Sequence, residues 1–148
     1  MKTNTKVAEL LVSYSAHIVS EQKISNSRET YSLIINHWNL DTIEMLEDVK
    51  ILLLNKSNKV LGVYDLSKGG MSSSIIDVKI VVSIALKTLA SGIIIAHNHP
   101  SGNLSPSKAD IDITKKLKST CNLMDITVLD HLIISKDNYY SFADDGLL

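Results

Sequence analysis

The sequence HNHPSGNLSPSKAD, residues 97–110, ends a predicted strand and leads into a predicted helix. It holds two histidines one residue apart, and residues at positions i and i+2 of an extended strand point to the same face. His97 and His99 therefore offer two imidazoles on one side of a strand end, and Asp110 can add a carboxylate from the helix. Two histidines and one carboxylate, with a fourth position left to water, form the ligand set of a catalytic zinc site.

The predicted helix, over about residues 106–120, selects Asp110 as the third ligand. Asp110, Ile113 and Leu117 recur at i, i+3 and i+7, so they share one face of the helix. That face is apolar, and burying a carboxylate on it is costly unless the group is paired or bound to a metal. Asp112 lies on the opposite side, where it favours a solvent-exposed position.

Two residues near this site keep alternative interpretations. The Ser107 hydroxyl can satisfy a free backbone N–H at the helix start, or it can donate a hydrogen bond to the attacking water or to an oxyanion, and position alone does not choose. His131, which follows Asp130, can support a metal ligand, replace one, or be a hydrogen-bonded structural histidine, and we favour the last. The histidine pair by itself would also fit two packed imidazoles.

A zinc hydrolase also needs a general base that takes a proton from the attacking water. Glu47 is the candidate, because alternation along the next predicted strand places it on the same face as Val49 and Ile51. Asp48 takes the other face. A carboxylate aligned with the core face of a strand start is unusual, although a charge at a fraying strand end remains the alternative. If the register differs, Glu44 or Asp48 would take the role.

Hydrophobic periodicity predicts helices and strands along the rest of the chain. The predicted helices cover residues 27–46, 77–91 and 106–120, with Ser27, Asp77 and Ser105 as N-caps. The predicted strands cover residues 49–54, 59–66, 92–100, 125–135 (one bent strand or two short ones) and 139–142. These elements do not alternate as regular βαβ units, so we expect an α+β domain with helices packed on a mixed sheet.

The composition is that of one globular domain. The 148 residues are 45% apolar and 21% charged, which is typical of neither a disordered nor a membrane protein. The net charge of −1 gives no general attraction to nucleic acid or anionic lipid. Cys121 is the single cysteine, and the sequence has neither a long apolar run nor a signal peptide pattern. We therefore expect a cytoplasmic protein with no internal disulfide and no membrane span.

The spacing from His97 to Asp110 resembles a known signature. HxH, seven residues, Ser, two residues and Asp is the pattern of the JAMM (MPN) zinc metallopeptidases, which also carry a Glu on an upstream strand. Three further stretches make the chain similar to the RadC family: LLLN (52–55), LDHLIIS (129–135) and YYSFAD (139–144). The resemblance predicts a RadC-like JAMM/MPN domain over residues 26–148, preceded by an N-terminal extension over residues 1–25.

This resemblance implies a fold and a set of roles. The fold would be the cytidine-deaminase-like JAMM/MPN architecture, in which helices flank a twisted mixed sheet. Zn²⁺ would be bound by His97, His99 and Asp110. Glu47 would act as the acid/base, and Ser107 would steady the tetrahedral intermediate.

Three functions compete. The leading hypothesis is a zinc-dependent metallohydrolase that cuts a peptide or isopeptide bond in an unidentified peptide or protein. The alternative is a non-catalytic MPN-like module that binds protein or DNA and is associated with DNA repair. Longer RadC members carry an N-terminal DNA-binding module for which the opening residues are too few, and residues 77–79 lack an expected Arg-Glu pair, so DNA binding is disfavoured. An iron oxygenase can use the same ligand types, but Ser107 and Glu47 favour zinc.

Overall fold

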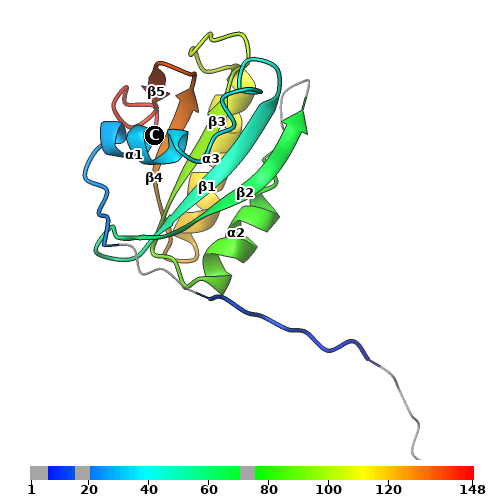
Figure 1. Ribbon diagram of the computed structural model, residues 1–148. Coiled ribbons are helices and arrows are strands. Elements are labelled where there is room, and N and C mark those ends of the chain that lie inside the picture. The colour runs from blue at the N-terminus through cyan, green and yellow to red at the C-terminus, as the bar shows by residue number, and fades with distance from the viewer. Residues whose placement is uncertain (1–6, 16–20, 71–75) are drawn as a thin grey trace, which may run out of the picture.

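A five-stranded mixed sheet forms the centre of the computed structural model, which describes residues 7–15, 21–70 and 76–148 (Figure 1). The strands, in sheet order, are β2 (Val60–Gly70), β1 (Glu47–Leu54), β3 (Gly92–Asn98), β4 (Thr127–Ile134) and β5 (Tyr139–Ser141). The helices are α1 (Ser27–Ile35), α2 (Val78–Lys87) and α3 (Lys108–Asn122). Only the β3–β4 pair is parallel among these strands. The predicted α+β class with helices on a mixed sheet is confirmed.

Helices cover both faces of the sheet. On one face, Val81 of α2 and Leu117 of α3 pack with strand residues that include Ile95. On the other face, Ile34 of α1 packs with strand residues that include Leu52, and Figure 1 shows α1 on the opposite side of the sheet from α2 and α3. Strands covered on both faces are apolar along nearly their whole length, which explains the continuous apolar runs of β1 and β3.

The helix ends differ from their predicted positions where tertiary contacts compete. Asp77 caps α2 as predicted, by accepting a backbone N–H. The helix predicted over residues 27–46 instead ends at Ile35, and its N-cap is Asn26. In the turns that follow, two backbone carbonyls accept hydrogen bonds from the side chain of Asn98, which lies far away in the sequence. Those carbonyls therefore have hydrogen-bond partners even though the helix does not continue to them.

All five predicted strands are present, with shifts of a few residues at their ends. β2 continues to Gly70, beyond the predicted range of 59–66. β4 is a single strand whose register against β3 shifts between Ile93 and Ile94, so the bent-strand alternative is correct. In the β1–β3 pair, the start of β1 lies beside the end of β3. Glu47 and the histidine pair therefore meet at the same end of the sheet.

The first 25 residues are described only at 7–15 and 21–25; residues 1–6 and 16–20 lie outside the described part of the chain. Ile24 is buried on the α1 face, and its backbone N–H donates to the carbonyl of Asn58. This contact attaches the chain, just before α1, to the turn between β1 and β2. The predicted boundary between extension and domain stays a prediction.

Candidate metal centre

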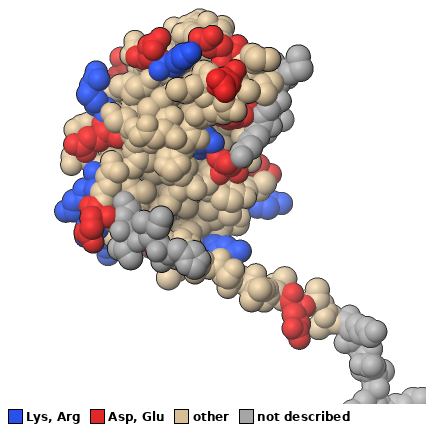
Figure 2. All heavy atoms as spheres, viewed as in Figure 1, with Lys and Arg blue, Asp and Glu red and all other residues tan. Residues whose placement is uncertain are grey.

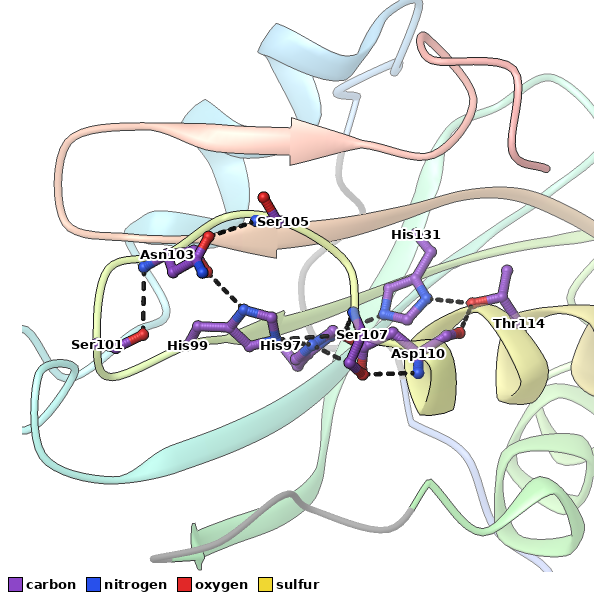
Figure 3. A network of polar contacts seen from close by, with 9 residues as sticks. All are labelled: His97, His99, Ser101, Asn103, Ser105, Ser107, Asp110, Thr114 and His131. Carbon is purple, nitrogen blue, oxygen red and sulfur yellow. Dashed lines mark hydrogen bonds and ion pairs between the residues drawn. The ribbon is translucent and has the colours of Figure 1, made fainter.

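Three side chains from adjoining elements converge at one end of the sheet (Figure 3). His97 lies in β3, His99 follows the end of that strand, and Asp110 lies in the first turn of α3. The two Nε2 atoms are 3.0 Å apart. The Asp110 Oδ1 atom lies 3.3 Å from His97 Nε2, and the Oδ2 atom lies 3.3 Å from His99 Nε2. All three predicted metal ligands are thus brought together.

The spacing of these atoms suits a small tetrahedral cation. Zinc bonds of about 2.0–2.1 Å to nitrogen or oxygen place neighbouring ligand atoms about 3.3 Å apart. The three measured separations of 3.0, 3.3 and 3.3 Å are close to that edge length. His97 is buried and His99 is partly exposed, so the donor set opens toward solvent on the His99 side. Such a set could hold a zinc ion and leave one position accessible.

A capping box places the Asp110 carboxylate. Ser107 is the N-cap of α3, and its hydroxyl oxygen accepts the backbone N–H of Asp110 at 3.0 Å. The Asp110 carboxylate in turn accepts the Ser107 backbone N–H at 2.8 Å. The helix therefore starts two residues later than predicted from Ser105 and Pro106, because the reciprocal pair satisfies two free backbone donors at once. The predicted capping role of Ser107 is thereby present.

In this cluster, the carboxylate of Asp110 and the neighbouring His99 ring each favour the charged form of the other. Burial would raise the pKa of the Asp110 carboxyl, but the adjacent His97 and His99 rings and the Ser107 backbone N–H hold that pKa far below its ordinary value. The Asp110 carboxylate raises the pKa of His99 above its usual 6.5, and the charge of Glu47 adds to this effect. The site thus keeps a full negative charge on Asp110 beside two ring nitrogens, as a cation site requires.

Glu47 lies on the face of the sheet that carries the two imidazoles. In the antiparallel β1–β3 pair, Val49 lies directly opposite His97, so Glu47 reaches the level of His99 on the same face. Its side chain is half-buried. Asp48 is buried on the opposite face. This placement agrees with the face expected for Glu47 from alternation, while its chemical role stays a prediction.

Asn98, between the two histidines, is a site residue that the sequence did not single out. It is fully buried, and its side-chain amide donates to the carbonyls of Ile43 and Leu46 at 2.7 and 2.8 Å. Its side-chain oxygen accepts N–H groups from Trp38 at 3.3 Å and from the Asp48 backbone at 2.8 Å. Asn98 therefore fixes the segment that leads into β1. The available signal was its position, since a polar residue between the histidines must point to the opposite, apolar face.

His131 and Thr114 form a buried continuation of the site. The His131 Nε2 atom lies 2.8 Å from His97 Nδ1, and its Nδ1 atom lies 2.6 Å from the Thr114 hydroxyl. Burial lowers the pKa of His131 well below its ordinary value. The ring is hydrogen-bonded, as expected for a structural histidine, but its partner is a predicted metal ligand. Thr114, four residues after Asp110, was not among the predicted site residues.

A cavity of about 480 Å³ lies directly beside His99. Its wall is built from three segments that meet at the histidine end of the sheet: Ile43–Glu44, His99–Gly102 and Ser135–Asp137. The lining includes both acidic and basic side chains, so the cavity suits a polar ligand. Glu44, the alternative acid/base, lines this cavity.

The surface charge is mixed. On the face shown in Figure 2, acidic and basic side chains are interspersed, and neither sign forms a continuous area. A nucleic-acid surface of the usual kind gathers Lys and Arg into a patch or stripe. That face therefore lacks the pattern expected for binding a phosphate backbone.

Comparisons with known proteins agree on one family. A family model described as RadC-like JAB domain matches residues 24–147. A UPF0758 protein of Flavobacterium johnsoniae is 50% identical over 101 residues, which are 68% of this chain and 44% of that protein. A UPF0758 protein of Porphyromonas gingivalis is 46% identical over 103 residues, or 69% of this chain and 45% of that protein. One from Clostridium perfringens is 35% identical over 144 residues, or 96% of this chain and 61% of that protein.

The chain spans about half the length of the curated relatives that it matches. The names of these relatives state no reaction, substrate or cofactor. Among the described residues, no helix is both long and apolar enough to cross a membrane.

Proposed function

This chain belongs to the RadC-like JAB domain family, an α+β domain of the JAMM/MPN type, and on that premise we propose that it is a zinc-dependent metallohydrolase that cuts a peptide or isopeptide bond. One observation carries the proposal: His97, His99 and Asp110 converge with separations that suit a tetrahedral ion. An intact donor set, open on one side, supports a catalytic centre over a non-catalytic module.

A zinc ion held by these residues would polarise the scissile carbonyl and make water a stronger nucleophile at neutral pH. The protein residues then have to bind the substrate and move protons. His97 and Asp110 are held rigidly by burial and by the capping box, respectively. A fixed donor set of this kind does not need to reorganise during the reaction. Such preorganisation of polar groups is the main source of electrostatic stabilisation in enzymes.

Glu47 is the proposed acid/base. Its carboxylate takes one proton from the attacking water as the oxygen–carbon bond forms, and it gives that proton to the leaving nitrogen as the carbon–nitrogen bond breaks. The β1–β3 register supports this role, because it brings Glu47 level with His99 on the ligand face. The proximity is also reflected in the pKa of His99, which Glu47 helps to raise after the larger effect of Asp110.

Ser107 is proposed to stabilise the negative charge that develops on the carbonyl oxygen. The capping bond uses a lone pair of its hydroxyl oxygen, which leaves the hydroxyl hydrogen able to donate. The side chain is exposed at the helix start beside the ligands. The cavity next to His99 is the proposed binding place for the substrate chain near the scissile bond.

The test combines metal analysis with hydrolysis. Protein purified without added metal is expected to contain zinc and not iron by elemental analysis, and to cleave members of a library of peptides and isopeptide-linked peptides. A chelator should abolish cleavage, and added zinc should restore it. Glu47→Ala should keep zinc but lose turnover, so unchanged turnover would exclude Glu47 as the base. Zinc without any cleavage would instead support the non-catalytic module, and iron would support an oxygenase.

A further inference from the structure

A buried chain of hydrogen bonds runs from His97 back to Asp110 through two residues that contact no proposed substrate (Figure 3). His97 Nδ1 lies 2.8 Å from His131 Nε2. His131 Nδ1 lies 2.6 Å from the Thr114 hydroxyl oxygen, which lies 2.6 Å from the backbone carbonyl oxygen of Asp110. His97, His131 and Thr114 are at most 2% exposed. Because water has so little access, each of these groups depends on the protein partners in the chain.

The donor and acceptor of each hydrogen bond in this series follow from its last acceptor, the backbone carbonyl oxygen of Asp110. A carbonyl oxygen carries no hydrogen, so the single hydroxyl hydrogen of Thr114 must point to Asp110. The Thr114 oxygen can then only accept, which makes His131 Nδ1 the donor in their 2.6 Å contact. A neutral imidazole with Nδ1–H has a bare Nε2. His131 Nε2 therefore accepts, and His97 Nδ1 donates.

We propose that His131 and Thr114 are positioning residues that hold His97 as the Nδ1–H tautomer, with its Nε2 lone pair aimed at the cation site. The inference deepens the metal site of the proposed function and rests on it for the identity of the cation. A ligand histidine commonly donates its other ring N–H to a carbonyl or carboxylate, which fixes its tautomer. Here a second histidine accepts that N–H, and a threonine on the neighbouring helix determines which nitrogen of the second ring is bare.

The surroundings of His131 hold it for this role. Its ring stacks on Phe142, with ring centres 4.7 Å apart and planes 11° apart. Its backbone pairs with Ile95 in the β3–β4 ladder, two residues before His97. Both the strand pairing and the ring stacking limit rotation of the imidazole. The series of hydrogen bonds also begins and ends at the same pair of residues. The backbone carbonyl of Asp110 accepts from Thr114, and the side-chain carboxylate of Asp110 faces His97 Nε2.

A purely structural role for His131 makes a different prediction. Packing against Phe142 would survive any change that keeps the size of the neighbouring side chains. The tautomer of His97, by contrast, depends on one hydroxyl group in α3. Replacing Thr114 by valine keeps its volume and branching but removes that hydroxyl. His131 Nδ1 then has no acceptor in its buried position, and Nε2 becomes the favoured place for its proton.

The experiment is performed on the metal-free protein with ¹⁵N-labelled histidine. In the wild-type protein, long-range proton–nitrogen correlation spectra are expected to show Nδ1–H tautomers for both His97 and His131. In Thr114→Val, both rings are expected to shift toward the Nε2–H tautomer. Zinc affinity, measured by competition with a chromophoric chelator, should fall by about 10- to 100-fold, the usual effect of losing such a supporting contact. Thr114→Ser retains a hydroxyl and should restore both readouts.

Thr120→Val is the matched control. Thr120 lies on the same helix, and its hydroxyl also donates to the carbonyl four residues earlier, at 2.8 Å from the oxygen of Lys116. This variant should leave both the tautomers and the zinc affinity unchanged. An Nε2–H tautomer for His97 in the wild-type protein would overturn the proposal, as would unchanged spectra in Thr114→Val. Because these readouts need no turnover, absence of hydrolysis would count against the proposed function alone.

Discussion

The side-chain oxygen of Asn98 accepts the backbone N–H of Asp48 at 2.8 Å, so the residue between the two histidines holds the start of β1. The two ligand rings point to one face of the sheet, and the Asn98 amide points to the other. This amide ties the end of β3 to the strand start that carries Glu47. The proposed base and the proposed metal ligands are therefore linked by a buried side chain that takes no part in the chemistry.

Replacement of Asn98 by alanine should destabilise the protein and misplace Glu47. The change removes four hydrogen bonds and leaves the buried carbonyl of Ile43 and the part-buried carbonyl of Leu46 without this partner. Leaving buried polar groups unsatisfied costs about 1–3 kcal/mol each, so we expect the free energy of unfolding to fall by about 2–4 kcal/mol. Denaturant titration measures this. Asn36→Ala, which removes an exposed amide that donates to Ser32, should cost about 0.5 kcal/mol or less.

The three acidic residues near the start of β1 should separate cleanly in a kinetic assay. Glu47→Gln is expected to lower kcat by about 10²–10⁴-fold, because it removes the group that moves the proton, while zinc content stays unchanged. Glu44→Gln changes the wall of the cavity beside His99 and should act mainly on KM. Asp48→Asn changes the opposite face and should leave kcat near wild type. A collapse of kcat in Glu44→Gln with retention in Glu47→Gln would reassign the base.

The sequence was sufficient to predict that His97, His99 and Asp110 converge, because the relevant geometry is local. The i, i+2 spacing of the two histidines and the helix face of Asp110 depend only on the periods of strand and helix. The face of Glu47 follows from alternation in the same way, and the β1–β3 register agrees with it. Assigning a residue to one face of its own strand or helix requires no knowledge of which helices and strands pack together.

Features that depend on tertiary contacts could not be predicted in this way. Ser105 and Ser107 are both good N-cap residues, and only the reciprocal bonds between Ser107 and Asp110 decide where α3 begins. The roles of Asn98 and Thr114 depend on partners from other elements. Periodicity contains no information about such partners, so the supporting residues were missed, while the three side chains predicted as ligands do converge.

The metal-free protein should lose stability as pH rises through the pKa of His99. The Asp110 carboxylate raises that pKa above 6.5, so the ion pair is fully present below 6.5 and disappears as His99 deprotonates. Asp110 stays charged throughout, because its own pKa lies far below its ordinary value. The stability difference between wild type and Asp110→Asn should therefore shrink as the pH rises above about 6.5, by about 1 kcal/mol or less for a partly exposed pair.

Saturating zinc should reverse the sign of this pH dependence. Protons compete with a cation for the histidine nitrogens, so the apparent zinc affinity rises with pH. Binding that is specific for the folded state adds to its stability. Thermal unfolding at several pH values, with and without zinc, measures both slopes. The same slope under both conditions would mean that zinc does not bind at His99 and Asp110.

Two substitutions at Ser107 should distinguish its capping role from its proposed role in catalysis. Ser107→Ala removes both the oxygen that accepts the Asp110 N–H and the hydroxyl hydrogen, so it should cost about 1 kcal/mol of stability and lower kcat by about 10²–10³-fold. Ser107→Asp keeps an oxygen that caps the helix but has no hydrogen to donate. It should therefore retain the stability and still lose the turnover. If turnover instead follows helix stability across both variants, Ser107 acts only by holding Asp110 in place, and the charge on the carbonyl oxygen must be stabilised by another group.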